Sequence, residues 1–495
     1  MSARWQAGHL PGLPREDIAW HTLRFGDASG TDLAPLEIDV PALTPAQAGA
    51  LAQRVRLSAR TYLQALPVSA VIDRIDRAVA RFLDPADPLR QQADDLLPRV
   101  SGYDASMVRL GLTRYLHAFR APQLHRFVAE DFSNPKVLDE FQPAVKGGAV
   151  RAVGPGLVVH HWAGNVPGLP LWSLACGLLV KAGNLGKLPS AEPVFASLFA
   201  RALAQEDQTL GECLAVLWWK GGEDEPARTL HAQADTVLAY GGQDSIARIR
   251  AQVPAGRRFL TYGHKLGVAL VGRAALDAQR GPGLARLAAQ DVARYEQQGC
   301  YSPHVFYVEA GARMAPRDFA QHLAGELAAM ALRHPRPTLS LPEAAAVAQW
   351  RQSVELAGLQ GKAPEDELFG DDASPWAVAF TQRAVPLAPS AGWRNVQVVA
   401  VDSLETAADA LAPYAAFLQT AGVAVEPARL YALAQRLART GVTRVCAIGS
   451  MTAPEAGWHH DGGFNLRDLV QIAEIEASAE RAADRLAPYA QEDGA

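Results

Sequence analysis

The sequence predicts an α/β protein, because short apolar runs alternate with helical runs from about residue 150 onward. Alternation of this kind is typical of a mostly parallel sheet covered by helices. The chain has 495 residues, which is too long for one small core and fits two or three domains. Ligands of such sheets bind at the carboxyl ends of the strands, so functional side chains are expected there.

Composition and charge are those of an ordinary globular protein. Charged residues make up 20% of the chain, hydrophobic residues 49%, and the net charge of −5 gives no bulk attraction to nucleic acid or anionic membranes. Four cysteines are too sparse for a disulfide scaffold and match no zinc motif, so we expect a reduced, cytoplasmic protein with no metal site.

Neither a secretion signal nor a membrane span is expected. The N-terminus lacks a basic region followed by an apolar run. The uncharged stretch from Leu157 to Val180 is long enough to cross a membrane, but its proline and glycine residues favour a strand, a loop and a helix.

The elements follow from local patterns. The first 95 residues are predicted to form an irregular lead followed by helices, with Thr44 as an N-cap before Pro45. Residues 70–83 and 104–119 have apolar positions at helical spacing. Strands are predicted at residues 157–161, 185–188, 215–219, 236–240, 305–308, 377–380, 396–401 and 444–448. Further helices are predicted at residues 169–182, 193–204, 243–252, 284–295, 317–333 and 404–420, and a long polar loop at 361–375.

The four cysteines differ in their surroundings. Cys176, Cys213 and Cys446 lie in apolar runs and are predicted to pack in the core. Cys300 lies in Q-Q-G-C-Y-S-P, a polar turn in which Gly299 permits close backbone approach. An exposed thiol there, beside backbone N–H groups, could be a nucleophile. From its spacing alone, Cys300 could equally be an ordinary loop cysteine.

A second candidate is Asn165, in the loop between a predicted strand and the helix after it. An asparagine at a strand end can donate its side-chain N–H to a developing negative oxygen. The simpler interpretation is that Asn165 caps the following helix, and taken alone this residue favours that interpretation.

Two further turns could hold a nucleotide. Lys187 follows the tight turn K-A-G-N, where a lysine can bind a ribose hydroxyl or a phosphate, although an ordinary surface lysine is the commoner case. Gly241 and Gly242 end a predicted strand before a helix, where backbone N–H groups can approach a pyrophosphate. A Gly-Gly pair alone is a weak signal, and the sequence has neither a G-x-G-x-x-G fingerprint nor a Walker motif.

Several motifs, taken together and in order, resemble one family. G-N-V-P begins at Gly164, A-G-N-L-G-K-L-P-S ends at Ser190, A-Y-G-G ends at Gly242, and Q-Q-G-C-Y-S-P-H contains Cys300. With G-V-T-R-V-C-A-I-G-S-M and W-H-H-D-G nearer the C-terminus, they resemble the LuxC-type acyl-CoA reductases, a branch of the aldehyde dehydrogenase superfamily. The resemblance covers about residues 107–475.

The resemblance implies an aldehyde-dehydrogenase-like fold with a Rossmann-like cofactor domain, an α/β catalytic domain and a small oligomerisation element. We place an N-terminal lead at 1–95, the cofactor domain at 96–266, the catalytic domain at 267–455, and a C-terminal segment that returns to the cofactor domain at 456–495. It also implies a homo-oligomer.

The resemblance assigns roles to the candidate residues. Cys300 would be the nucleophile, and the Asn165 side chain with the Cys300 backbone N–H would form an oxyanion hole. Lys187, Ser190, Gly241 and Gly242 would lie along NADPH, although Lys187 comes two residues earlier after the G-N turn than in typical aldehyde dehydrogenases. The substrate would be a long-chain fatty acyl thioester, supplied as acyl-CoA or by a partner protein that activates or transfers acyl groups.

One departure from the superfamily is informative. Hydrolytic aldehyde dehydrogenases carry a general-base glutamate in E-L-G-G-K, where this chain reads T-Y-G-H-K with Thr261 first, and no carboxylate occurs between Leu260 and Leu276. A cysteine thioester without that base should survive until it is reduced. The superfamily's second glutamate, in E-I-F-G-P, also has no counterpart in A-P-S-A-G-W-R-N-V.

The sequence therefore favours an acyl-CoA reductase that forms a covalent acyl-cysteine. The alternative is an aldehyde dehydrogenase that oxidises aldehyde to acid or acyl-CoA with NAD(P), against which the absent carboxylate argues. A non-catalytic carrier or scaffold that retains the fold is a third possibility, which the presence of Cys300 and Asn165 disfavours.

Overall fold

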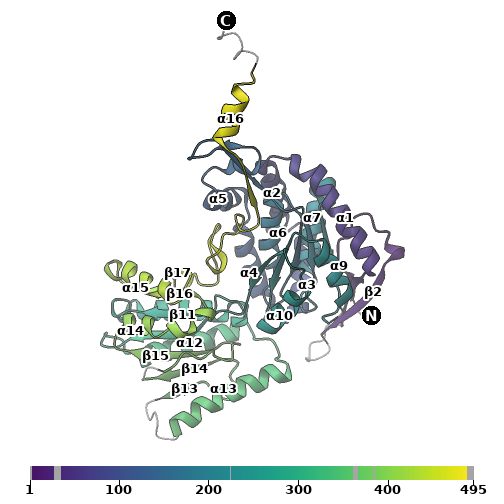
Figure 1. Cartoon of the computed structure of the whole chain (residues 1–495). Helices are drawn as coiled ribbons and strands as arrows, with labels where there is room; N and C mark the ends of the chain where they lie inside the picture. The colour runs from purple at the N-terminus through teal and green to yellow at the C-terminus, as the bar shows by residue number, and fades with distance from the viewer. Residues whose placement is uncertain (1–2, 27–34, 223, 360–365, 383–384, 488–495) are drawn as a thin grey trace.

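The computed structural model describes residues 3–26, 35–222, 224–359, 366–382 and 385–487. Figure 1 shows two α/β bodies side by side, with the helix α16 projecting at the top. The α/β class predicted from the sequence is confirmed.

The first body is built on a five-stranded parallel sheet in the order β10-β9-β6-β7-β8. Its strands are β6 (Leu157–His161), β7 (Gly183–Lys187), β8 (Leu214–Leu217), β9 (Thr236–Tyr240) and β10 (Arg258–Tyr262). The helices α6 (Pro170–Leu179), α7 (Phe195–Glu206), α9 (Asp224–Gln233) and α10 (Gln243–Gln252) connect them. The chain order reverses at β6, so the crevice at its carboxyl end is the expected ligand site.

The second body is a seven-stranded sheet in the order β13-β14-β15-β12-β11-β16-β17, parallel except for β13. Its strands are β11 (Leu266–Val271), β12 (Pro303–Glu309), β13 (Glu367–Phe369), β14 (Ala377–Thr381), β15 (Asn395–Val401), β16 (Leu418–Ala424) and β17 (Arg444–Ala447). Its helices are α11 (Gly281–Ala293), α12 (Pro316–Arg333), α13 (Leu341–Leu359), α14 (Leu404–Asp409) and α15 (Pro427–Arg439).

The N-terminal part differs from the prediction. Where an irregular lead was expected, β1 (Ala3–Gln6), β3 (Leu36–Ala42) and β2 (Ala19–Phe25) form a three-stranded sheet. The helices that follow are α1 (Pro45–Thr61), α2 (Val68–Leu83), α3 (Pro88–Ser101), α4 (Ala105–His117) and α5 (Ala121–Asp131). The predicted cap at Thr44 is confirmed, because its hydroxyl accepts from the Gln47 backbone N–H and the Gln47 side chain returns to the Thr44 N–H.

The C-terminal segment returns across the molecule. The strand β18 (Gln471–Ile475) pairs antiparallel with β5 (Ala149–Val153), which pairs with β4 (Gln142–Pro143), and α16 (Ala477–Asp484) follows. On the way, the Asn465 side chain accepts from Trp172 Nε1 in α6 at 3.0 Å. Residues 458–465 are therefore held against the first body, close to the crevice.

Two predictions in the second body are wrong in part. The helix predicted at 404–420 ends with α14 at Asp409, and the chain then forms a 3-10 turn over Ala412–Phe417 and the strand β16. Pro413 cannot supply a backbone N–H to a continuing helix, and β16 is buried between β11 and β17. The loop predicted at 361–375 contains β13, and residues 361–365 lie outside the described residues.

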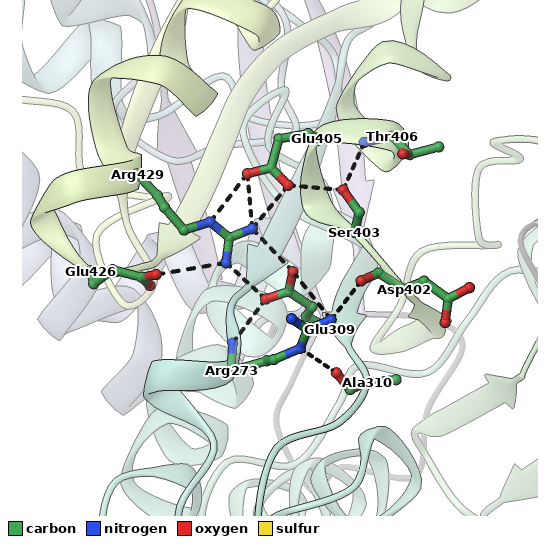
Figure 2. A network of polar contacts seen from close by, with 9 residues as sticks. All are labelled: Arg273, Glu309, Ala310, Asp402, Ser403, Glu405, Thr406, Glu426 and Arg429. Carbon is green, nitrogen blue, oxygen red and sulfur yellow. Dashed lines mark hydrogen bonds and ion pairs between the residues drawn. The ribbon is translucent and has the colours of Figure 1, made fainter.

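A network of ion pairs secures the carboxyl end of β12 (Figure 2). The Glu309 carboxylate is buried and accepts from Arg429 of α15 at 2.9 and 3.0 Å and from the Arg273 backbone N–H at 3.1 Å. Arg429 also donates to Glu405 of α14 at 2.9 Å. These contacts lower the pKa of Glu309 below its usual value despite burial, and they tie α14 and α15 to the sheet.

Within the described residues, no helix is both long enough and apolar enough to cross a membrane. The stretch from Leu157 to Val180 instead forms β6, a loop and α6, as predicted.

Candidate active site

A cavity of about 380 Å³ lies where the two bodies and the returning C-terminal segment meet. From the first body it is lined by the loop after β6 and by the residues that follow β9 and β10. From the second body it is lined by the turn before β12 and by a loop before β15. The lining residues that carry the argument are Asn165, Tyr262, Gln298, Cys300, His304 and His460. Cys300 and Asn165, which are far apart in sequence, therefore share one cavity.

A strained turn presents Cys300. Tyr295, Glu296 and Gln297 all have positive φ angles, of 52°, 52° and 64°. Residues other than glycine adopt this region only when their surroundings hold them, at a cost of roughly 1–3 kcal/mol each. The surroundings are a buried ion pair between Glu296 and Arg394 at 2.7 Å, and the Gln297 amide, which donates to the Pro303 carbonyl at 2.7 Å.

Cys300 lies three residues after this turn and three residues before β12 begins, and it is half-buried. Burial and, to a smaller extent, the nearby Asp461 carboxylate raise the pKa of its thiol to about 12. A hydrogen bond from Gln419 Nε2, 3.3 Å from the sulfur, and the charge of Arg444 act in the opposite direction. At neutral pH the cysteine of the free protein is therefore a thiol, and it would have to lose this proton to act as a nucleophile.

Asn165 lies in the loop after β6, and its Nδ2 donates to the Gln298 carbonyl at 2.7 Å. The interpretation of Asn165 as a helix cap is wrong, because α6 begins at Pro170 after Leu169 and has no side-chain capping bond. Tyr103 donates to the Asn165 carbonyl at 2.9 Å. The side-chain amide is thus held beside the Cys300 turn, with a second N–H available for a further acceptor.

The residues predicted to contact a cofactor flank the central strand β6. Lys187 ends β7 and lies over the Trp219 ring at 5.4 Å, so it is not an ordinary surface lysine. Burial lowers the pKa of Lys187 to about 8. Ser190 is exposed and accepts from Trp218 Nε1 at 3.0 Å.

On the other side of β6, Gly241 follows β9, and Gly242 is the N-cap of α10. A Cβ placed on Gly242 would meet no heavy atom within 4 Å. Protein packing therefore does not require glycine at this position, and the space beside the helix N-terminus fits an approaching phosphate. In the described residues no carboxylate pairs with the Lys187 ammonium, which leaves that charge free to meet an anion.

The structure adds residues that the sequence did not indicate. His460, from the W-H-H-D-G motif, lines the cavity and stacks on Tyr262 with ring centres 4.3 Å apart. Burial lowers the pKa of His460 to about 4, so its imidazole is neutral. Gln419 and Asp461 lie behind the Cys300 sulfur. The motif that contains His460 and Asp461 contributes to the family resemblance but indicates no role for either residue, and no local signal in the sequence marks Gln419.

The predictions for the other three cysteines are confirmed in part. Cys176 and Cys213 are buried as predicted, but Cys446 in β17 is only half-buried, because β17 is the last strand of its sheet. Thr261, in the position of the general-base glutamate, is exposed in β10. The described residues that line the cavity include no aspartate or glutamate. Nor do the described residues contain a cluster of three or more His, Cys, Asp or Glu side chains that could hold a metal ion.

The two α/β bodies form an aldehyde-dehydrogenase-like fold, which several solved structures share. Aldehyde dehydrogenase 21 from Physcomitrella patens matches with a TM-score of 0.71 at 13% identity, covering 96% of this chain and 99% of that one. An NADP-dependent glyceraldehyde-3-phosphate dehydrogenase from Bacillus halodurans C-125 matches with a TM-score of 0.69 at 13% identity, covering 96% and 100%.

Within this fold class, the chain belongs to the acyl-CoA reductase (LuxC) family, which residues 63–472 match. It is similar to the long-chain acyl-protein thioester reductase of Photorhabdus luminescens, with 26% identity over 76% of this chain and 75% of the relative. The enzyme of the same name from Aliivibrio fischeri is 26% identical over 71% and 70%. The resemblance read from the motifs is confirmed, and with it the class of acyl reductase.

Proposed function

We propose that this protein reduces a long-chain fatty acyl thioester to the aldehyde, using NADPH and a covalent acyl intermediate on Cys300. The observation that carries the proposal is the cavity that brings Cys300 and Asn165 together without a carboxylate in its described lining. It rests also on membership of the acyl-CoA reductase family.

In the first step the Cys300 sulfur attacks the thioester carbonyl carbon. The carbonyl oxygen becomes an oxyanion, which accepts from Asn165 Nδ2 and from the Cys300 backbone N–H. Each such donor lowers the barrier by about 3 kcal/mol. The C–S bond to the carrier then breaks, the acyl group remains on Cys300, and the carrier leaves as a thiol with the equivalent of the proton that Cys300 has lost.

NADPH, when bound, would supply the hydride that reduces the acyl carbon. Lys187, Ser190, Gly241 and Gly242 would hold it, the lysine and the α10 N-terminus meeting its phosphates. Cys300 then leaves as thiolate and the aldehyde is released. We accordingly assign residues 96–266 to cofactor binding and 267–455 to catalysis.

Water is the competitor for the acyl-cysteine. A general base would have to lie within hydrogen-bond reach of a water molecule beside the acyl carbon. Thr261 cannot act in this way, and the buried imidazole of His460, with its lowered pKa, is a weak base. Slow hydrolysis favours reduction over acid formation.

The relatives are named for acyl groups carried on protein, so the carrier of the acyl group for this chain is either CoA or a partner protein. Measuring NADPH oxidation with acyl-CoAs of increasing chain length, and with an acylated protein donor, distinguishes these carriers and tests the preference for long chains.

The central test is acylation without cofactor. The wild-type protein, incubated with radiolabelled long-chain acyl-CoA, should become covalently labelled, and Cys300→Ala should not. Cys446→Ala is the matched control, since it removes another half-buried thiol and should leave labelling intact. Labelling of Cys300→Ala would refute the nucleophile assignment. Addition of NADPH to the labelled protein should release aldehyde, whereas release of acid would favour the aldehyde dehydrogenase alternative.

A further inference from the structure

The sulfur of Cys300 has a side-chain partner that the proposed chemistry does not use. Gln419, the second residue of β16, is fully buried, and its Nε2 lies 3.3 Å from the Cys300 sulfur. A buried amide so close to a reactive sulfur restricts where that sulfur can lie.

The orientation of this amide is fixed on both sides. Gln419 Nε2 also donates to Asp461 Oδ1 at 2.5 Å, and Gln419 Oε1 of the same side-chain amide accepts from Thr420 Oγ1 at 3.2 Å. An amide rotated by 180° would point its oxygen at both the carboxylate and the sulfur. The hydrogen bonds therefore determine that an N–H group, and not the oxygen, faces Cys300.

Asp461 is itself held in an unusual conformation. Its φ is 53°, in the left-handed region, within the turn His460–Gly462 of the returning C-terminal segment. Its side chain is only 15% exposed, and His460 Nε2 lies 4.0 Å from Oδ1. The turn thus places the Asp461 carboxylate beside the Gln419 amide, which in turn contacts the Cys300 sulfur.

The two partners act on the thiol in opposite directions. A hydrogen bond to sulfur favours the thiolate, whereas a nearby carboxylate disfavours it. The other charged or titratable groups that face the sulfur are Arg444 of β17, which favours the thiolate, and Tyr301, the next residue in the chain. Because the two side chains act on the thiol in opposite directions, substituting each one separately shows whether it raises or lowers the reactivity of the Cys300 sulfur.

We propose that Gln419 is a positioning residue that holds the Cys300 sulfur through an N–H donor, and that Asp461 both orients this donor and restrains the nucleophile by its charge. The inference deepens the proposed function, since it assumes that the Cys300 sulfur is the reacting atom. In the resting protein the thiol is held in place and unreactive; an acyl substrate that displaces water strengthens the N–H contact as charge develops on the sulfur.

The test is the pH dependence of Cys300 alkylation by iodoacetamide, followed by mass spectrometry of the peptide that carries Cys300. Gln419→Leu keeps the size and removes the donor, so alkylation at pH 8 should slow about tenfold, as expected for a hydrogen bond to a charged group. Asp461→Asn keeps an acceptor for Gln419 and removes the charge, so alkylation should become several-fold faster. Opposite signs from two neighbouring substitutions are not expected from a general loss of packing.

Thr381→Val is the matched control, because Thr381 is a buried threonine of β14, which three strands of the same sheet separate from β16. It should leave the alkylation rate unchanged. The proposal is overturned if Gln419→Leu alkylates like the wild type, or if both variants change in the same direction. If Gln419→Leu does not fold, the sign of the Asp461→Asn effect alone decides.

Alkylation requires neither an acyl thioester nor NADPH. If the two substitutions have opposite effects on alkylation but the protein is never acylated, the inference about Gln419 and Asp461 is supported and the proposed function is refuted. If Cys300 is acylated but neither substitution alters its alkylation, the proposed function is supported and the inference about Gln419 and Asp461 is refuted.

Discussion

The two ends of β12 are held by different kinds of polar contact. At the carboxyl end, the buried Glu309 carboxylate is paired with Arg429, which also pairs with Glu405 (Figure 2). At the amino end, Cys300 is a neutral thiol with one amide donor. Nearby, Ser302 Oγ and Gln297 Oε1 are buried with no hydrogen-bond partner.

We therefore expect the carboxyl end of this seven-residue strand to contribute mainly to stability, and the amino end to contribute mainly to the proposed chemistry. Charges that satisfy one another hold the carboxyl end, and their removal should affect folding. The amino end combines a strained turn with incompletely paired polar atoms, each of which costs about 1–3 kcal/mol. Such costs are tolerated where a site must bind something further, so changes there should affect chemistry more than folding.

The largest expected effect is at the reactive end. Cys300→Ala should reduce thioester reductase activity by a factor on the order of 10⁴ or more, because the covalent route is lost. Its free energy of unfolding should stay close to that of the wild type. Steady-state NADPH oxidation and urea denaturation measure the two quantities, and substantial residual activity would mean that another group attacks the thioester.

The second largest effect is expected at Asn165, which also lies beside the amino end of β12. Asn165→Ala should lower kcat by about 10²–10³, the usual cost of losing one oxyanion donor. Asn165→Asp, which replaces the donor by a charge, should be worse than alanine. A loss confined to KM would instead indicate that Asn165 only binds substrate.

At the ion-paired end, Arg429→Met should lower the free energy of unfolding by about 3 kcal/mol, because it leaves the buried Glu309 carboxylate without its main partner. Arg436→Met, in the same helix, breaks an exposed pair with Asp409 and should cost less than about 1 kcal/mol. Denaturation at pH 7 compares them, and equal costs would contradict the assignment of stability to the Glu309 network.

The Arg429→Met effect should also depend on pH. The folded-state pKa of Glu309 lies below its usual value of 4.5, so its ion pairs contribute fully above that pH and are lost as pH falls below it. The stability difference between wild type and Arg429→Met should therefore shrink on acidification. A difference that stays constant down to pH 3 would show that the arginine acts through packing.

Alkali should produce a pH-dependent effect at the Cys300 end. The pKa of this thiol is raised from 9.0 to about 12, so above pH 9 the unfolded chain loses the proton that the folded protein keeps. The wild type should lose stability relative to Cys300→Ala by about 1.4 kcal/mol per pH unit in that window. Parallel unfolding profiles of the two proteins from pH 8 to pH 11 would show that the thiol is not held neutral.

Several features were determined by the sequence alone. The strands at 157–161 and 236–240 and the helix at 243–252 match the structure to the residue, because buried parallel strands and their flanking turns are continuous local patterns. The turn around Cys300, the loop around Asn165 and the family were also readable, since each depends on a short motif.

Only the tertiary structure decided what surrounds the sulfur. Gln419 lies 119 residues from Cys300 and 42 from Asp461, and these contacts form because β16 adds to the sheet beside β11 while the C-terminal segment folds back. The run L-Q-T-A-G-V-A has small residues and follows a helical pattern, so its burial in a sheet could not be read locally. Short motifs determined which sulfur is proposed to react, and long-range packing determined which side chains contact that sulfur.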